Sequence, residues 1–582
     1  MSTRSKLVAA ARGDQAPDTL ISEVRLLNVL TLTEEDVDIG IVGSRVAFVV
    51  PAGTVQPGID IRVIDGRGLF AVPGFVDGHV HNESSQVVPS QWVKSILCHG
   101  TTTVFTDPHE IGNVLGLPGI LYMIAASRNL PLRYFITAPS CVPAVPGLET
   151  AGAMITYKEM AEILSWGRVK AVAEAMDYMG LIRQKGNITS IVETAHFMGV
   201  GIESHAPGVT GRNLQAYLSA TGPQAADHEA RTCEEMVEKV KAGMMVYCRA
   251  STFLDGTPDF AKAYSQVGDS RMFGFCTDDV MPHHLLYYGH LDWGIRRLIE
   301  CGVKPIVAYQ MASLNVATHY RLQGVGAIAP GWFADIVLLD DPVSVSVKHV
   351  ISNGCLVVSD RKLMVEIPKT DPPLLVFNSV RIPYLSEENF VLRGNGKETV
   401  FNGIHMPTIF TELAKIPLKV KAGKVVYPLP EDVTMVAIVP RHGQNRLPML
   451  VPMTGYQLQR GAIASTVSHD SHNLVIIGKN PQDMIAAALE LKRCGGGLTA
   501  VLDGRVLATI ELPVAGLMST LTVEEVGEQD LKFESVLPQL GLPQAFPIHL
   551  LALALPVVPW FRVTDLGLVD VANQTFVPLI AG

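Results

Sequence analysis

Two histidines separated by a single residue form the first group in this chain with the residue types and spacing of a chemical site. His79 and His81 lie in the segment PGFVDGHVHNESS, residues 73–85. Side chains at positions i and i+2 of a strand point to the same face, so both imidazoles can bind one metal ion. Because an H-x-H pair also occurs as two unrelated surface histidines, further ligands must decide whether a metal site exists.

Further metal-binding side chains follow later strand-like runs. Glu174 ends the run VKAVAE, His205 follows GVGIES, His228 follows QAAD, and Asp278 follows FGFCT. A bridging carboxylate lets two divalent cations lie about 3.5–4 Å apart and share one hydroxide. Glu174 or His228 taken singly is equally compatible with a structural role. With the H-x-H pair, four histidines and two carboxylates at strand ends indicate a dinuclear metal centre.

These side chains require a scaffold that brings strand ends together. Eight strand-like runs precede or contain them, at residues 73–79, 102–106, 133–138, 169–174, 199–204, 225–228, 244–249 and 272–277. Helical stretches separate several of the runs, for example residues 292–302 with an apolar stripe. Alternating strands and helices over a segment of this size predict an α/β fold with a TIM-like (β/α)8 barrel, which carries its active site at the C-terminal ends of the strands.

The rest of the chain divides into segments with different patterns of apolar and polar residues. Residues 23–72 and 326–375 alternate apolar and polar positions in short runs, so we predict a small β-sandwich domain built from segments that flank a barrel of residues 73–325. Residues 1–22 are predicted as an N-terminal extension. Residues 376–582 are predicted as a separate C-terminal α+β domain, with a helix that starts after Asn480 and stops at the glycines 495–497.

Several long segments resemble the adenine deaminase family of the amidohydrolase superfamily, and the resemblance covers nearly the whole chain. They are PGFVDGHVHNESS (73–85), HGTTTVFTDPHEIGNVLG (99–116), SHAPGVTGRNLQAY (204–217), ADHE (226–229), CTDDVMPHHLL (276–286) and GAIASTVSHDSHN (461–473). The resemblance implies a first metal held by His79, His81 and Asp278, a bridge at Glu174, and a second metal held by His205 and His228. It also implies Mn²⁺ or Fe²⁺ in preference to Zn²⁺.

The activity implied by this resemblance is hydrolytic deamination of adenine to hypoxanthine and ammonia, in which a metal-bound hydroxide attacks C6. We expect three catalytic residues. Asp278 would orient and deprotonate the water, Glu174 would bridge the metals, and Glu110 would deliver a proton to a purine ring nitrogen.

Other residues near these motifs are candidates for binding the substrate. Asp107 and His109, in DPHE (107–110), either contact the substrate or brace the metal ligands. Glu83 and Ser84 either line the pocket, as we expect, or cap the following helix. In the C-terminal domain, VPRHGQNR (439–446) and SHDSHN (468–473) contribute either to a lid, pocket or subunit contact, or to a buried polar network. We expect the network for most of these residues.

The chain departs from the family pattern at Gln86, Asp177, Ser204, His283 and His284, where Met, Asn, Gly and two acidic residues are usual. None of these positions is a predicted ligand. Because changes in a pocket can retune recognition of ring substituents, an N6-substituted purine stays an alternative substrate.

Two further alternatives belong to other classes. A cyclic amide hydrolase would bridge its metals with a carboxylated lysine, but Lys170 starts rather than ends its strand, so Glu174 fits better. A non-catalytic purine-binding scaffold has no need to keep all six ligands. The zinc deaminases that use an H-x-E motif also need P-C-x-x-C, which this sequence lacks.

Composition narrows the choice of partners and compartment. The formal net charge of −10 argues against a nucleic-acid partner. The apolar run 548–560 contains Pro556 and Pro559 and is too short to span a bilayer, and the first 20 residues do not resemble a signal peptide. We therefore predict a cytoplasmic protein without nucleic-acid or membrane partners, and the resemblance implies a small-molecule purine as its substrate. Because barrel enzymes with extra domains are often dimers, we also predict a homodimer.

Overall fold

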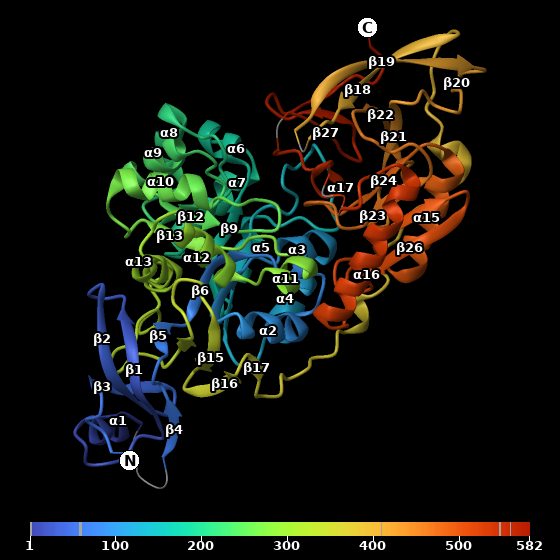
Figure 1. Ribbon diagram of the computed structural model, residues 1–582. Helices are drawn as coiled ribbons and strands as arrows, with labels where there is room; N and C mark the ends of the chain where they lie inside the picture. Colours follow the sequence, from blue (N-terminus) through green and yellow to red (C-terminus); the bar gives the residue numbers. More distant parts are fainter. Residues whose placement is uncertain are drawn as a thin grey trace.

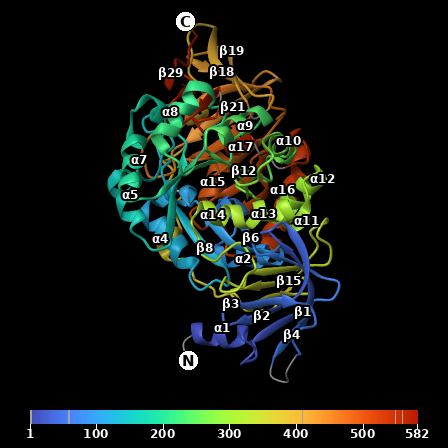
Figure 2. The same cartoon turned by 90° about the vertical axis from the view of Figure 1, so that its left-hand side faces the viewer.

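The computed structural model describes residues 3–56, 61–408, 410–545, 547, 549–558 and 560–581. A central barrel separates an N-terminal sheet from a C-terminal domain, and these two parts lie at opposite ends of the molecule (Figures 1 and 2).

The barrel consists of eight parallel strands paired in sequence order. They are β6 (Phe75–Val80), β7 (Thr101–Thr106), β8 (Arg133–Pro139), β9 (Val169–Ala175), β10 (Gly201–Ser204), β11 (Ala225–Asp227), β12 (Met245–Arg249) and β13 (Phe273–Cys276). A parallel bridge between Val80 and Asp278 brings the end of β13 beside β6, so the ring is nearly closed. The predicted barrel is confirmed, and the ends of its strands differ from the predicted ends by at most two residues.

Helices follow the strands and cover the outside of the barrel (Figure 1). They are α2 (Pro89–Cys98), α3 (His109–Leu115), α4 (Leu117–Ala126), α5 (Tyr157–Leu164), α6 (Tyr178–Arg183), α7 (Asn187–Phe197), α8 (Gly211–Thr221), α9 (Cys233–Lys241), α10 (Thr257–Val267), α11 (Pro282–Tyr287), α12 (Leu291–Glu300), α13 (Pro305–Gln310) and α14 (Val316–His319). The predicted apolar stripe exists in α12, where Ile295, Leu298 and Ile299 are buried. Their spacing places them on one face of the helix, against the barrel.

The segments before and after the barrel join in one nine-stranded sheet. Its strands are β1 (Thr19–Asn28), β2 (Thr33–Val42), β3 (Arg45–Pro51), β4 (Arg62–Asp65), β5 (Phe70–Pro73), β14 (Ile336–Leu339), β15 (Val347–Ser352), β16 (Cys355–Ser359) and β17 (Lys362–Leu363). Antiparallel pairing of β5 with β14 links the two segments, which share one hydrophobic core. The sheet begins at Thr19, within the predicted extension 1–22, and helix α1 (Thr3–Ala11) precedes it.

The C-terminal domain has a second nine-stranded sheet and a small three-stranded sheet. The strands are β18 (Glu398–His405), β19 (Glu412–Lys421), β20 (Lys424–Val425), β21 (Val433–Val439), β22 (Met449–Thr454), β23 (Ala462–Ser465), β24 (Leu474–Gly478), β25 (Gly497–Leu502), β26 (Arg505–Glu511), β27 (Phe561–Val563), β28 (Leu568–Asp570) and β29 (Thr575–Val577). The helices are α15 (Pro481–Cys494), α16 (Val523–Val536) and α17 (His549–Ala552).

Helix α15 is the helix predicted from residue 480 onward. The side chain of Asn480 accepts a hydrogen bond from the backbone N–H of Asp483 at 2.8 Å and caps the N-terminus. The helix ends at Cys494 because Gly495 takes a left-handed conformation with φ of 85°, which a glycine adopts without steric cost.

Among the residues that the structure describes, no helix is both long enough and apolar enough to cross a bilayer. The apolar run 548–560 contains the short helix α17. Positions 548 and 559 of this run lie outside the described residues.

Candidate metal centre

The six predicted metal ligands converge at the C-terminal ends of the barrel strands. His79 lies in β6 and Glu174 in β9, while the other four directly follow strands: His81 after β6, His205 after β10, His228 after β11, and Asp278 in the segment after β13. All six are buried. Because these residues come from five strands and nearly 200 positions of sequence, only the barrel closure brings them together.

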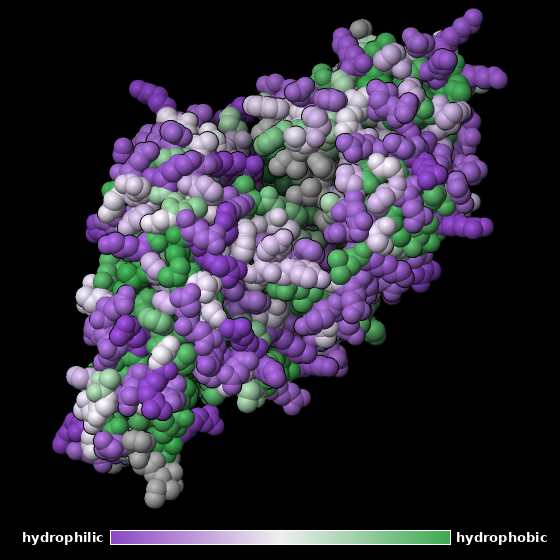
Figure 3. Space-filling view, viewed as in Figure 1, coloured by the Kyte–Doolittle hydropathy of each residue, from purple (hydrophilic) through white to green (hydrophobic). Residues whose placement is uncertain are grey.

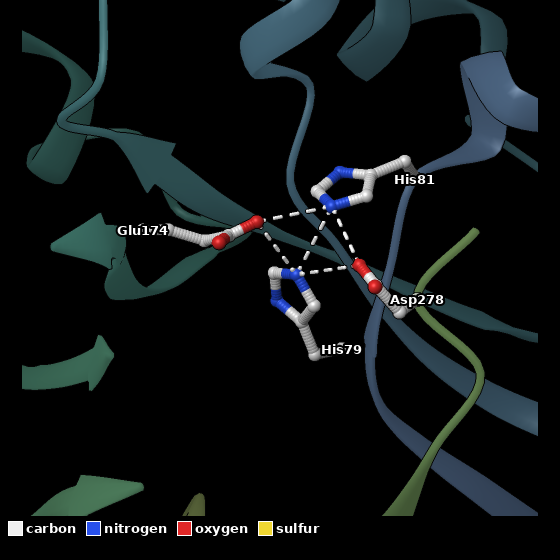
Figure 4. A group of neighbouring side chains, drawn as sticks. All are labelled: His79, His81, Glu174 and Asp278. Atoms are coloured by element: carbon white, nitrogen blue, oxygen red, sulfur yellow. Dashed lines mark hydrogen bonds and ion pairs between the residues drawn. The ribbon is translucent and has the colours of Figure 1, made fainter. Parts of the chain in front are cut away.

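Glu174 lies at the middle of this group. Its Oε1 is 3.0 Å from Nε2 of His79 and 3.0 Å from Nε2 of His81 (Figure 4). Its Oε2 is 2.6 Å from Nδ1 of His205 and 3.4 Å from Nε2 of His228. Each carboxylate oxygen therefore faces a different pair of imidazoles, an arrangement suited to a bridging ligand.

Asp278 completes the side of the group that contains the H-x-H pair. Its Oδ1 is 3.0 Å from Nε2 of His81 and 3.6 Å from Nε2 of His79 (Figure 4). Its backbone has φ of 59°, which is unfavourable for a residue with a side chain. Two backbone hydrogen bonds hold it there, from its N–H to the carbonyl of His79 at 2.9 Å and from the N–H of His81 to its carbonyl at 3.0 Å.

The donor set fits a metal centre. Nε2 of His79 and Nε2 of His81 are only 3.2 Å apart, so both imidazoles direct their nitrogens at the same point. Nε2 of His228 is buried and has no hydrogen-bond partner among the described residues. Buried nitrogens without partners are costly, whereas a cation at this point would satisfy them. The mixture of imidazole and carboxylate is compatible with several transition metals.

A cavity of about 280 Å³ is lined by predicted metal ligands of the barrel and by residues of the C-terminal domain. Five predicted site residues line it: His81, His109, Glu174, His205 and Asp278. The surface is visibly hollowed between the two domains (Figure 3). The C-terminal domain contributes both polar and apolar walls: Phe410, His469, Asp470, Leu551, Ala552, Leu555 and Val558.

The other predicted residues lie behind the cavity wall. Asp107 accepts a hydrogen bond from Nδ1 of His109 at 2.9 Å, so it orients a residue of the wall. Ser84 Oγ is 3.1 Å from Oε1 of Glu110 and 2.6 Å from Oδ1 of Asp279, and Asp279 lines the cavity. Burial raises the pKa of Glu110.

Glu83 is also buried behind the wall. It lies with Ser84 in a short 3-10 turn (Asn82–Ser85) rather than at the start of α2. Its Oε1 accepts a hydrogen bond from the backbone N–H of Ile111 at 3.3 Å. Burial, together with the nearby carboxylate of Glu110, raises the pKa of Glu83 to about 8.

Sequence reasoning missed four charged residues of the wall. Arg249 ends β12, and its Nη2 is 2.6 Å from Oδ2 of Asp278 and 3.3 Å from Oδ2 of Asp279. It also pairs with Glu229. The fourth residue, Arg231, lies two positions after Glu229, in the loop between β11 and α9. The sequence could have predicted three of these residues, because Glu229 and Asp279 directly follow predicted ligands and Arg249 ends a predicted strand.

The prediction that most polar residues of the two C-terminal motifs form a buried network agrees with the structure. Arg441 donates hydrogen bonds to the carbonyl of His472 and to Oγ of Ser379, and His442 donates to the carbonyl of Ser471. His469 and Asp470 instead line the cavity, Asn445 is exposed, and Gln444 and Arg446 are half-buried.

The alternative bridging ligand lies elsewhere. Lys170 is near the start of β9, and its Nζ lies 5.2 Å from the ring centroid of Phe135. It lines a separate small cavity with Glu203 and His319. The residues that depart from the family pattern are also outside the lining of the main cavity, and Asp177 instead caps helix α6 through the N–H of Gly180 at 2.9 Å.

The fold and the site together define an amidohydrolase. Residues 70–357 match the amidohydrolase family, and residues 408–575 match the adenine deaminase C-terminal domain. The adenine deaminase of Methanothrix thermoacetophila is 37% identical over 98% of this chain and 99% of that protein, and the adenine deaminase of Kosmotoga olearia is 35% identical over 99% of each. The chain belongs to the adenine deaminase family.

Among solved structures, a β-aspartyl dipeptidase from Fervidobacterium islandicum AW-1 is similar with a TM-score of 0.47 at 18% identity, over 60% of this chain and 98% of that chain.

Proposed function

We propose that this enzyme deaminates adenine by hydrolysis and releases hypoxanthine and ammonia. The observation that carries the proposal is Glu174, whose two oxygens face separate histidine pairs at the floor of a cavity. Relatives named adenine deaminase are 35–37% identical to the chain over nearly its full length, which supports adenine as the substrate.

For the metal centre we propose two ions that share Glu174. His79, His81 and Asp278 would hold one ion, and His205 and His228 would hold the other. We favour Mn²⁺ or Fe²⁺ over Zn²⁺. Bound metal ions of this kind lower the pKa of water toward about 7, so that hydroxide is available at neutral pH.

Asp278 takes the proton of the attacking water in this proposal. Its Oδ1 faces the imidazoles of the H-x-H pair, while its Oδ2 is held by Arg249 at 2.6 Å. Oδ1 is thus directed at the proposed metal centre, while the contact of Oδ2 with Arg249 fixes the orientation of the carboxylate. Geometry of this kind is a requirement for a general base.

Glu110 supplies the proton that reaches a ring nitrogen of the purine. Burial raises its pKa, which favours the protonated form that a general acid needs. Glu110 lies behind the wall, and its Oε1 is 3.5 Å from Nδ1 of His469, which lines the cavity. A Glu110→Gln protein with wild-type turnover would exclude this role.

His109 and Asp107 orient the substrate side of the site. Because Nδ1 of His109 donates a hydrogen bond to Asp107, Nε2 is the ring nitrogen that points away from Asp107. This Nε2 is buried and has no hydrogen-bond partner among the described residues, so it is available to a ligand.

The proposal is tested by ammonia release from adenine, N6-methyladenine, adenosine and guanine, with added manganese or iron. We expect adenine to be the best substrate. Strong activity on adenosine with none on adenine would overturn the assignment, and ring opening of a cyclic amide without ammonia would favour the alternative amidohydrolase activity. The homodimer and the cytoplasmic location stay predictions, and sedimentation analysis tests the first.

A further inference from the structure

The loop between β23 and β24 carries residues of the C-terminal domain into the cavity. His469 and Asp470 lie on this loop and line the same cavity as four of the proposed metal ligands, His81, Glu174, His205 and Asp278. The barrel supplies the metal ligands, so this loop is a separate contribution from the second family domain.

The loop is fixed by backbone and side-chain hydrogen bonds on both sides of Asp470. The N–H of His469 donates to the carbonyl of Leu551 at 2.8 Å, and Nε2 of His442 donates to the carbonyl of Ser471 at 2.7 Å. Nδ2 of Asn473 donates to the carbonyl of Thr150, in the barrel, at 2.8 Å. These hydrogen bonds therefore set the backbone position of Asp470 before a ligand binds.

Asp470 has a free hydrogen-bonding atom. Only 1% of the residue is exposed, its Oδ1 is 3.6 Å from Nε2 of His109, and its Oδ2 has no hydrogen-bond partner among the described residues. Nε2 of His109 also lacks a hydrogen-bond partner within that part of the chain. A buried carboxylate oxygen without a donor is costly, so this atom indicates a ligand that brings an N–H or O–H group.

The wall next to Asp470 is apolar. Leu551, Leu555 and Val558 line the same cavity. A flat heterocycle can pack its faces on such side chains while its polar edge meets the few hydrogen-bonding groups, the usual division in small-molecule sites. The mixed wall thus suits an aromatic base with an N–H on its edge.

We propose that Asp470 is a specificity-determining residue that accepts a hydrogen bond from the N–H of the five-membered ring of the substrate base. The inference rests on the proposed deamination of adenine. Neutral adenine carries one N–H on this ring, whereas a substituent at N9, such as a ribose, removes it. Asp470 therefore selects the free base over the nucleoside from the C-terminal domain.

The test compares Asp470→Asn with wild type in the metal-loaded, full-length enzyme. For each protein, kcat and KM are measured with adenine, and the inhibition constant is measured with 9-methyladenine, which lacks the ring N–H. Asp530→Asn is the matched control, because Asp530 is a buried acid of the same domain that does not line the cavity. Asp470→Ser replaces Asp470→Asn if the latter does not fold.

We expect Asp470→Asn to lower kcat/KM for adenine at least about 10-fold, mainly through KM, because the neutral amide oxygen accepts a weaker hydrogen bond than a carboxylate does. The inhibition constant of 9-methyladenine should change less than twofold, the metal content should be unchanged, and Asp530→Asn should behave as wild type.

Three results would overturn the inference: equal losses for adenine and 9-methyladenine, loss of metal from Asp470→Asn, or wild-type kcat/KM in that variant. Equal affinity of wild type for the two compounds would overturn it as well. If wild type releases no ammonia from adenine, the proposed function itself fails, so the two failures are distinguishable.

Discussion

Nη2 of Arg249 lies 2.6 Å from Oδ2 of Asp278 in the wall of the cavity. The same guanidinium pairs with Glu229 and lies 3.3 Å from Asp279. One cation therefore orders three carboxylates around the site, and one of them is both a proposed metal ligand and the proposed base. Arginine suits this position because its planar group offers several donors in a fixed geometry.

Arg249→Gln is expected to lower kcat at least about 100-fold, or about 2.7 kcal/mol in activation free energy, because the Asp278 carboxylate loses the guanidinium that orients it. Steady-state turnover of adenine together with metal content checks this. Arg297→Gln, which breaks a partly exposed pair with Asp255, is the control and should retain turnover. Wild-type kcat in Arg249→Gln would contradict the role of Arg249.

Glu174→Gln is expected to reduce the metal content and abolish turnover. A glutamine amide has a single oxygen, so it cannot present an acceptor to both histidine pairs as the carboxylate does. Elemental analysis of the purified protein measures the metal bound per chain. Glu203→Gln is the control, because Glu203 is buried in the neighbouring strand but pairs with His319 away from the main cavity. Equal metal content in both variants would disprove the bridge.

The convergence of the six proposed metal ligands could be predicted from the sequence for a simple physical reason. Parallel strands of a barrel all end at the same mouth, so residue type and strand end are sufficient to place His79 or Asp278 near one another. The position of Asp107 near the site could also be predicted, since it directly follows a strand. The hydrogen bond by which it orients His109 is visible only in the structure.

The remaining part of the site depends on the packing of two domains. No periodicity relates Asp470 to His109, which lies 361 positions earlier, and their approach to 3.6 Å results from the docking of the C-terminal domain. The polar motif SHDSHN therefore left two interpretations open. Four of its residues, 468 and 471–473, lie outside the cavity lining, while His469 and Asp470 belong to it.

Lys239→Met is expected to destabilise the fold by about 3–5 kcal/mol, because it removes the cation of a fully buried ion pair. Nζ of Lys239 donates to Asp227 at 2.9 Å, to Glu235 at 2.6 Å and to the carbonyl of Ala206 at 2.8 Å. A decrease in the melting temperature measured by calorimetry checks this.

The control for Lys239 is Lys262→Met, whose exposed pair with Asp259 should contribute little. A melting temperature of Lys239→Met within one or two degrees of the control would show that the two carboxylates are satisfied without the lysine.

The buried imidazole of His442 is expected to make the protein sensitive to mild acid. Burial, together with the neighbouring charge of Arg441, lowers the pKa of His442 to about 3. In the unfolded chain its pKa is about 6.5, so between these values the unfolded state binds more protons than the folded state. Stability therefore falls as the pH decreases below about 6.5, by up to about 1.4 kcal/mol per pH unit.

His442→Gln keeps an N–H donor for the carbonyl of Ser471 but removes the titrating group. The melting temperature of this variant should decrease less steeply than that of wild type between pH 6.5 and 5, with the two curves parallel above pH 7. Because every other titrating group is shared, the difference between the curves isolates His442. Parallel curves over the whole range would mean that the imidazole binds protons equally in the folded and unfolded states, and so would contradict the lowered pKa of His442.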